Sequence, residues 1–258
     1  MFVDSDFDVR LHRFHPARDT GPRLLCTPHA GGSAGFFRQL SAALTPGVEV
    51  LAAQYPGRSG RYREQPLDNI EAMAADITRV MDPLLDRPLA LFGHSMGAVV
   101  AFEIAHFLER KGAVPLALFV SGYRGPSAPQ AGLTHQLSDA MLVRELRAVQ
   151  GTNPGYLDHP EGLRLLLPTV RRDLRAAEMY QSAHDQPLRC PVVAMIGTAD
   201  PKVTTDEAGL WSDETTADFQ LRTYTGGHFY LNDHFLAIGR SIAADLDGSH
   251  RGSGRAVF

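Results

Sequence analysis

The stretch Leu89-Ala-Leu-Phe-Gly-His-Ser-Met-Gly-Ala-Val-Val-Ala-Phe-Glu-Ile-Ala decides the fold. It opens with four apolar residues, continues with the pattern G-x-S-x-G at positions 93–97, and then stays largely apolar to about Leu108. A strand, a sharp turn and a helix in this order are typical of a nucleophile elbow, which holds a serine at the tip of a strained turn. We therefore predict that the Ser95 hydroxyl points out of a sheet as a nucleophile. A glycine-rich turn without chemistry is the alternative.

The residues next to Ser95 suit such a turn. Gly93 and Gly97 leave room where the backbones of strand and helix come close. Met96 opens the helix, so its backbone N–H has no partner within the helix and lies at the positive end of the helix dipole. This N–H is a candidate to bind a developing oxyanion.

Segments on both sides of this motif alternate between short apolar runs and helical patterns. The further expected strands are 11–14, 23–27, 48–54, 116–121, 191–197 and 219–224, and the expected helices are 35–44, 69–81, 207–211 and 233–246. This alternation predicts an α/β fold with a mostly parallel sheet and helices on both faces.

The alternation breaks between residues 125 and 186, where no segment has a convincing strand pattern. Ser138 is placed to cap one helix, and residues 160–180 form a second, amphipathic helical pattern that Pro168 is expected to interrupt. Its predicted apolar face consists of Leu165, Leu166, Val170, Leu174, Ala177 and Met179. We predict a core of residues 1–124 and 187–247, a helical lid at 125–186 and a disordered tail at 248–258. A helical excursion that only completes the core is the alternative to a lid.

Composition limits the possible partners and the location. The chain has 258 residues, 44% of them apolar, and a net charge of −4, which disfavours binding to nucleic acid or to an anionic membrane. No run approaches the length of a membrane span. Residues Met1 to Asp8 lack the apolar segment of a signal peptide, so we expect a cytoplasmic protein.

Neither a metal nor a cofactor is expected. Cys26 and Cys190 lie far apart, in no metal-ligand spacing, and beside predicted buried strands, which favours reduced core thiols. The sequence contains no H-E-x-x-H motif, and no G-x-G-x-x-G fingerprint follows a strand.

A serine nucleophile needs a base, and the base needs a residue that orients it. In α/β-hydrolases the order along the chain is serine, acid, histidine. Asp200 lies just past the strand that ends at Gly197, and His228 lies just past the last strand. We predict that His228 accepts the Ser95 proton and that Asp200 fixes the tautomer of His228. The rival acids and bases, none of which directly follows a strand, are Asp185, Asp206, Asp218, His184 and His234.

A second oxyanion donor is expected from the loop after the early strand, Pro28-His-Ala-Gly-Gly. The backbone N–H of Ala30 is favoured, with that of Gly31 as the alternative. His29 and His94 lie within the two motifs, and we expect them to orient the loops and not to react.

These motifs together resemble the stand-alone type II thioesterases that accompany modular polyketide synthases and nonribosomal peptide synthetases. The matching pieces run in family order from about Leu24 to Leu231: Pro28-His-Ala-Gly-Gly-Ser, Tyr55-Pro-Gly-Arg, Gly93-His-Ser-Met-Gly-Ala, Leu166-Leu-Pro, Arg172-Asp, Gly197-Thr-Ala-Asp and Gly226-Gly-His-Phe-Tyr-Leu. The loop Gly57-Arg-Ser-Gly departs from the family's usual Pro-Gly-Arg-Gly, so the resemblance assigns no role to Arg58.

The resemblance implies an α/β-hydrolase fold, a mobile helical lid and the triad Ser95, Asp200 and His228. It also implies hydrolysis of stalled acyl groups, short or aberrant ones, on the phosphopantetheine arm of an acyl or peptidyl carrier protein, by an enzyme that we expect to be monomeric. A general carboxylesterase or acyl-CoA hydrolase and a non-catalytic carrier-binding protein are the alternatives.

Docking of an acidic carrier protein on this net acidic chain would need a local basic patch. Two groups of arginines are candidates: Arg58, Arg61 and Arg63 in one loop, and Arg171, Arg172 and Arg175 in the predicted lid.

Overall fold

The computed structural model describes residues 6–128, 132–149 and 157–252. In this part of the chain, seven strands form one sheet in the order β1-β3-β2-β4-β5-β6-β7. The strands are β1 (Leu11–His12), β2 (Arg23–Thr27), β3 (Glu49–Ala53), β4 (Leu89–His94), β5 (Leu118–Ser121), β6 (Val192–Gly197) and β7 (Phe219–Tyr224). β1 runs antiparallel to β3, and the other neighbouring pairs are parallel. The predicted mostly parallel α/β fold is confirmed.

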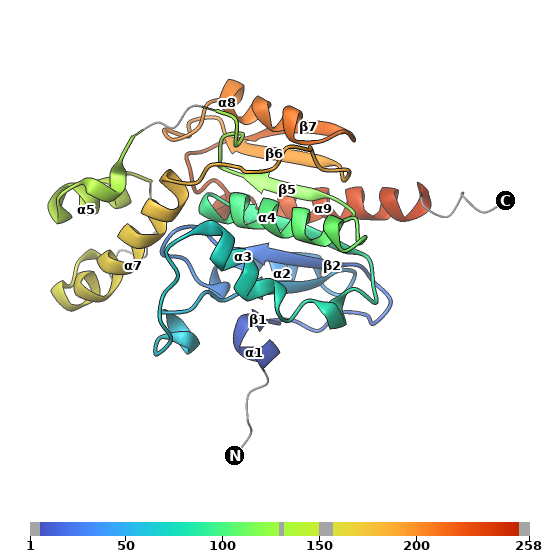
Figure 1. The fold of residues 1–258 in the computed structure, drawn as a ribbon, viewed down its shortest axis with the longest axis horizontal. Coiled ribbons are helices and arrows are strands. Elements are labelled where there is room, and N and C mark those ends of the chain that lie inside the picture. The colour runs from blue at the N-terminus through green and yellow to red at the C-terminus, as the bar shows by residue number, and fades with distance from the viewer. Residues whose placement is uncertain (1–5, 129–131, 150–156, 253–258) are drawn as a thin grey trace, which may run out of the picture.

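Helices cover both faces of this sheet (Figure 1). The longer helices that pack on it are α2 (Arg38–Leu44), α3 (Ile70–Thr78), α4 (Met96–Arg110) and α9 (Leu231–Gly252). α3 and α4 bury their apolar residues against one face, and α2 and α9 bury theirs against the other. Successive strand residues such as Leu24 and Leu25 point to opposite faces and join different cores, as the two-residue period of a strand requires. Two short helices, α1 (Asp6–Arg10) and α8 (Thr205–Gly209), complete the core elements.

Several details differ from the sequence prediction, among them the following. The short helix α1 was not expected. The expected helix 35–44 begins as the 3-10 turn Ala34–Phe37 before α2. The predicted disordered tail is wrong for residues 248–252, because α9 continues to Gly252 and only residues 253–258 lie outside the described part. The buried Ile242 and Leu246 fix the preceding turns, and no proline follows to break the helix.

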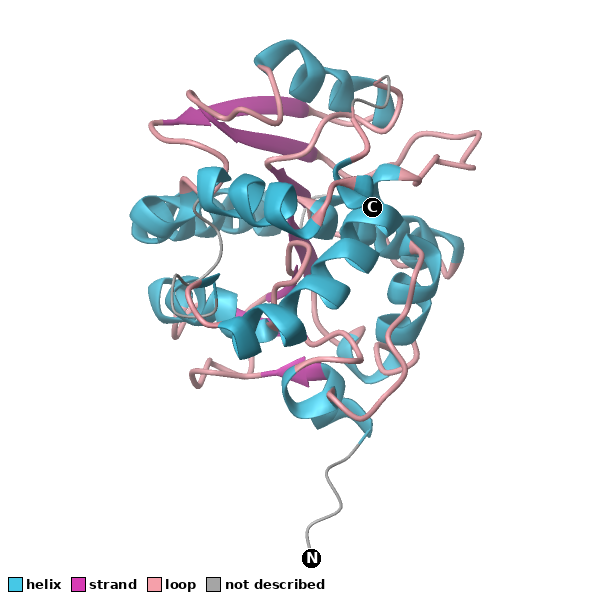
Figure 2. Cartoon of the chain, turned by 90° about the vertical axis from the view of Figure 1, so that its left-hand side faces the viewer, coloured by secondary structure: helices cyan, strands magenta, loops and turns pink. Residues whose placement is uncertain are grey.

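The helices α5 (Asp139–Val149) and α7 (Pro160–Glu178), which we call the lid helices, lie beside the sheet at the left of Figure 1. Figure 2 looks from that side and shows helices in front of the strands. The predicted interruption at Pro168 is wrong, since α7 is continuous with the proline inside it. Proline removes one backbone donor, and Leu167, Val170 and Ala177 on either side lie in one buried stripe that keeps the helix together.

No helix within the described ranges is long and apolar enough to cross a membrane. Cys26 and Cys190 are both buried and free of disulfides. Burial raises the pKa of the Cys26 thiol well above its usual range, and burial together with Glu109 raises the pKa of Cys190 to about 12. Both thiols therefore stay protonated core groups.

Candidate active site

The turn between β4 and α4 holds Ser95 in a strained conformation, with φ of 54° and ψ of −124°. The residues two positions before and after Ser95 must be glycines because the strand, the helix and β2 come very close there. A Cβ on Gly93 would lie 2.1 Å from the carbonyl oxygen of Gly97, and a Cβ on Gly97 would lie 2.0 Å from that of Thr27. The Thr27 hydroxyl also donates to the Gly97 carbonyl at 2.7 Å, which ties β2 to the start of α4. The G-x-S-x-G pattern therefore forms the tight elbow that the sequence predicted.

The structure brings Ser95, His228 and Asp200 into one chain of hydrogen bonds. His228 Nε2 lies 3.1 Å from Ser95 Oγ, and His228 Nδ1 lies 2.9 and 3.1 Å from the two carboxylate oxygens of Asp200. The Asp200 side chain is fully buried, and that of His228 is 8% exposed. The Lys202 backbone N–H donates to Asp200 Oδ1 at 2.8 Å, which leaves the carboxylate facing the imidazole. This geometry suits a serine activated by a histidine whose tautomer the carboxylate fixes.

The rival acids and bases stand apart from Ser95. His184 Nε2 lies 3.0 Å from both carboxylate oxygens of Glu103, and His234 Nε2 lies 2.9 Å from the Thr225 carbonyl oxygen. The rival acids are all exposed: Asp185, Asp206 and Asp218.

His29 and His94 form a buried aromatic layer beside His228. The ring centroids of His94 and His228 are 5.2 Å apart, and those of His29 and His94 are 5.9 Å apart. Burial, with smaller contributions from His228 and Arg58, lowers the pKa of His29 to about 3, and burial holds the pKa of His94 well below its usual range. Both rings are therefore neutral near pH 7 and add no positive charge beside His228.

His94 contacts the hydroxyl of Ser121, which in turn contacts the hydroxyl of Tyr230. Its Nδ1 lies 3.0 Å from Ser121 Oγ, which lies 2.7 Å from the Tyr230 hydroxyl oxygen. Sequence reasoning did not find Ser121 or Tyr230 as supports of this layer.

Of the two expected oxyanion donors, Met96 directly follows Ser95 at the start of α4, and Ala30 lines a cavity together with Ser95. Within the described residues, neither the Ala30 N–H nor the Met96 N–H donates to another protein group. The Gly31 N–H is occupied, because it donates to the Asp173 carboxylate at 2.7 Å. This contact favours Ala30 over Gly31 as the second donor.

Ser95 and His228 line a cavity of about 380 Å³ that also includes His29 and Ala30. The cavity lies between the loops that follow β5 and β6 and the lid helices. Its apolar wall comes mainly from the lid: Leu142, Leu146, Val149, Val170, Leu174 and Ala177. Such a wall suits a carbon chain attached to the carbonyl that Ser95 attacks.

The predicted apolar face of α7 is partly wrong. Val170 and Leu174 line the cavity as expected. Leu165 and Met179 are 78% and 61% exposed, and Leu167 is buried in their place. The buried stripe of α7 is thus narrower than its apolar composition suggested.

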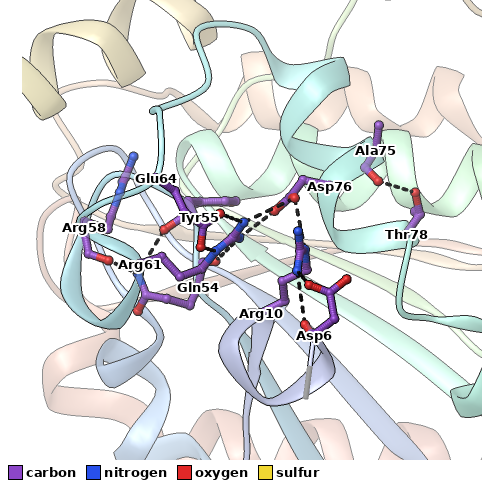
Figure 3. Close-up of polar contacts among 10 residues, drawn as sticks. All are labelled: Asp6, Arg10, Gln54, Tyr55, Arg58, Arg61, Glu64, Ala75, Asp76 and Thr78. Carbon is purple, nitrogen blue, oxygen red and sulfur yellow. Dashed lines mark hydrogen bonds and ion pairs between the residues drawn. The ribbon is translucent and has the colours of Figure 1, made fainter. Parts of the chain in front are cut away.

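The predicted basic patch in the loop after β3 is also wrong, because Arg58 and Arg61 are buried in ion pairs. Arg58 pairs with Asp173, and Arg61 donates to Asp76 at 2.5 Å, to Glu64 and to the Gln54 carbonyl. Figure 3 shows Arg61 and Arg10 converging on Asp76, so these cations hold core elements together. Of this group, Arg63 is exposed.

The lid arginines are only partly available. Arg171 donates to the carbonyl oxygens of His135 and Leu137 and pairs with Asp139, so it joins α7 to the segment before α5. Arg175 is exposed and Arg172 is half-buried, and these two remain candidates for a docking surface.

Within the described residues, no group of three or more His, Cys, Asp or Glu side chains is arranged to hold a metal ion. The contact of Ser95 Oγ with His228 Nε2 at 3.1 Å is the arrangement in which a histidine can activate a serine hydroxyl.

The mostly parallel sheet, the serine elbow and the carboxylate–histidine–serine contacts define an α/β-hydrolase of the serine type. A family model described as a thioesterase domain matches residues 22–246, and the chain therefore belongs to the thioesterase family.

The relatives refine this assignment to type II thioesterases. The chain is 45% identical over 246 residues to Thioesterase PikA5 of Streptomyces venezuelae, covering 95% of this chain and 87% of the relative. It is also 45% identical over 236 residues to a probable cadicidin biosynthesis thioesterase of Streptomyces griseus, covering 92% of this chain but only 65% of that protein's length. The solved type II thioesterase BorB, from the borrelidin biosynthetic cluster, has a TM-score of 0.86 and 46% identity, covering 93% of this chain and 98% of that one.

Proposed function

We propose that the chain is an editing thioesterase that hydrolyses short or aberrant acyl groups from the phosphopantetheine arm of acyl or peptidyl carrier proteins. The observation that carries this proposal is the hydrogen-bonded series Ser95–His228–Asp200 at the wall of a cavity lined on its far side by apolar lid residues. The family match and the relatives named for cadicidin and borrelidin biosynthesis support it. A cytoplasmic location remains part of the proposal.

The first half of the reaction forms an acyl-enzyme. The Ser95 oxygen attacks the thioester carbonyl while His228 Nε2 takes the hydroxyl proton, and Asp200 stabilises the resulting imidazolium. The tetrahedral oxyanion accepts hydrogen bonds from the N–H groups of Ala30 and Met96. The carbon–sulfur bond then breaks, and the departing pantetheine sulfur receives the proton from His228.

The second half releases the acid. Water enters the space left by the pantetheine thiol and attacks the acyl-Ser95 ester, while His228 takes a proton from it. The second tetrahedral intermediate uses the same two donors. When it breaks down, His228 returns the proton to Ser95 Oγ and a carboxylic acid leaves. The site is thereby restored with one water consumed.

The triad assignment is tested by Ser95→Ala and Asp200→Asn on an acyl-carrier-protein substrate. Ser95→Ala should lose the acyl-enzyme, detected by mass spectrometry, and leave only the residual rate that binding and the oxyanion donors supply. Asp200→Asn should lower kcat by about 10⁴-fold, because the neutral amide no longer enforces the imidazole tautomer. Near-wild-type kcat in Asp200→Asn would show that another residue orients His228.

The choice of substrate separates this proposal from its alternatives. A carrier-directed enzyme should have a higher kcat/KM for acyl-carrier protein than for the same acyl group on coenzyme A or on p-nitrophenol. Equal or higher values for the small esters would favour a general esterase or acyl-CoA hydrolase. No turnover of any thioester by the wild-type chain would favour a non-catalytic carrier-binding protein.

Docking of the carrier protein involves the two lid arginines that are not held in the contacts of Arg171. The exposed Arg175 and the half-buried Arg172 lie on α7, whose Val170 and Leu174 line the cavity. We infer that these two arginines attract the acidic carrier and that its arm then enters toward Ser95. Charges of this kind act mainly on the rate of association.

A further inference from the structure

A carboxylate of the lid is buried against the core beside the active site. The Asp173 side chain on α7 is 1% exposed, and that of its partner Arg58 is 9% exposed. Arg58 Nη1 lies 2.5 Å from Asp173 Oδ2, and Arg58 Nη2 lies 2.8 Å from Asp173 Oδ1. This bidentate geometry fixes both the distance and the orientation of the two groups.

The same pair grips the loop that carries Ala30. Asp173 Oδ2 accepts the Gly31 N–H at 2.7 Å, and Arg58 Nη1 donates to the Gly32 carbonyl oxygen at 3.2 Å. The Gly31 N–H that donates to Asp173 belongs to the peptide bond between Ala30 and Gly31. This peptide bond comes directly after the one that carries the Ala30 N–H. A lid residue thus holds the backbone one peptide away from a proposed oxyanion donor.

Packing between α7 and this loop is equally close. Gly31 has a φ of +74°, and a Cβ built on it would lie 2.5 Å from Val170 Cγ2. From the core side, the Tyr55 hydroxyl donates to the Pro28 carbonyl at 3.3 Å, and the Arg58 guanidinium lies 5.3 Å above the Tyr55 ring. The loop is therefore held between Tyr55 below and α7 above.

We propose that Asp173 and Arg58 are positioning residues for the oxyanion hole, so that the hole is complete only when α7 is seated on the core. The proposal rests on the proposed function of Ser95 and Ala30. Oxyanion donors act when they lie about 2.7–3.1 Å from the developing charge, and loss of one donor lowers kcat by roughly 10²–10³-fold. A displacement of the Ala30 N–H by about 1 Å would take it beyond hydrogen-bond distance of the oxyanion and remove most of that effect. Seating of α7 over a bound acyl group would then switch on the chemistry.

The test replaces Asp173 by alanine and measures turnover of an acyl-N-acetylcysteamine thioester, which needs no carrier docking. We expect kcat to fall by about 10²-fold with KM changed less than about threefold, since the contact acts on the transition state. The inhibition constant of an alkyl boronic acid, whose adduct with Ser95 carries a tetrahedral oxyanion, should rise by the same factor as kcat/KM falls. The carboxylic acid product, which lacks this geometry, should bind as to the wild type.

Asp76→Ala is the matched control. Asp76 is also a buried carboxylate paired with an arginine of the same loop, Arg61 at 2.5 Å, yet its described contacts are to Arg10 and Arg61 and reach neither α7 nor residues 28–32 (Figure 3). Its loss should lower the free energy of unfolding and leave kcat/KM and the boronic acid constant near their wild-type values.

Asp173→Asn covers the case in which the alanine variant does not fold. It keeps an acceptor for the Gly31 N–H but loses the charge opposite Arg58, so we expect a smaller kcat loss of roughly 10-fold, again matched by the boronic acid. The positioning role would be overturned by a wild-type kcat, by a change confined to KM, or by a lower kcat with unchanged boronic acid affinity. These three results count against the positioning role only while turnover still depends on Ser95. Full turnover in Ser95→Ala would instead refute the proposed function.

Discussion

Leu142→Ala should loosen the lid helix α5 without unfolding the core. Leu142 is fully buried and is the one buried residue of α5 (Asp139–Val149), where it also lines the site cavity. The other apolar residues of the helix are half-buried or exposed, and Met141 is 43% exposed. The hydrophobic contact that holds α5 down therefore depends largely on one side chain.

The size of the effect follows from the atoms removed. Deleting three buried carbon groups at about 0.8 kcal/mol each removes about 2–3 kcal/mol of transfer free energy. A Leu→Ala change in a closed core costs about 2–5 kcal/mol because a cavity adds to this loss. We take the transfer loss alone, about 2–3 kcal/mol, as the expected cost of opening α5. The equilibrium for local opening of α5 should rise by about 30- to 140-fold, at about 1.4 kcal/mol for each tenfold change.

Amide hydrogen exchange measures this opening. Exchange of the amides in residues 142–149 should accelerate by that factor, while amides of β4 and β5 exchange as in the wild type. Met141→Ala on the same helix is the control and should change the exchange by less than about threefold. Equal acceleration in α5 and the core strands would show that α5 opens only by global unfolding, and no acceleration would show that Leu142 does not hold the helix.

Two further predictions concern charge. Burial, with smaller effects of His184 and Arg110, lowers the pKa of His106 to about 4. Between pH 6.5 and 4 the unfolded chain therefore binds a proton at His106 that the folded chain does not. The free energy of unfolding falls as the pH falls through this window. Urea titrations over this window give the slope of the unfolding free energy against pH. In His106→Gln this slope should be shallower by about 1.4 kcal/mol per pH unit. An unchanged slope would contradict the difference in protonation. For docking, kcat/KM on acyl-carrier protein should fall as salt rises while that on the small thioester stays constant, and Arg172→Glu with Arg175→Glu should cause the same selective loss. Equal salt dependence for the two substrates would refute electrostatic docking.

The strands and the placement of the site were predictable because they depend on local patterns. The expected strands 23–27 and 219–224 coincide with β2 and β7, since each apolar or alternating run is bounded by turn residues. Parallel strands end at a common edge, so residues placed just after their ends come together. This reasoning brought Ser95, Asp200 and His228 to one point, where the structure places them within hydrogen-bond distance. Their catalytic roles remain a proposal.

The roles of the arginines were not predictable in the same way. Arg58 lies in an irregular loop, where no periodicity indicates which side chains are buried, and its partner Asp173 is 115 residues away along the chain. A signal did exist in α7. Asp173 follows Val170 by three residues and precedes Ala177 by four, which places a carboxylate within the buried stripe of an amphipathic helix. An acid at such a position requires a buried partner, and the candidates were the arginines of the sequence.

The Asp173–Arg58 ion pair adds little to the stability of the seated α7, but it fixes the position of α7 on the core. Burying two charges costs solvation free energy that their attraction only partly repays, and apolar residues of the same volume are often as stabilising or more so. An apolar contact, however, does not fix the direction of a neighbouring peptide, whereas Asp173 and Arg58 together bond to the Gly31 N–H and the Gly32 carbonyl. If α7 lifts, as the proposed coupling requires, both charges regain water, so separation recovers much of the solvation that closure removed. The ion pair thus fixes the position of the loop when α7 is seated, and little free energy is needed to separate it for product release. A lid coupled to the oxyanion hole requires both properties.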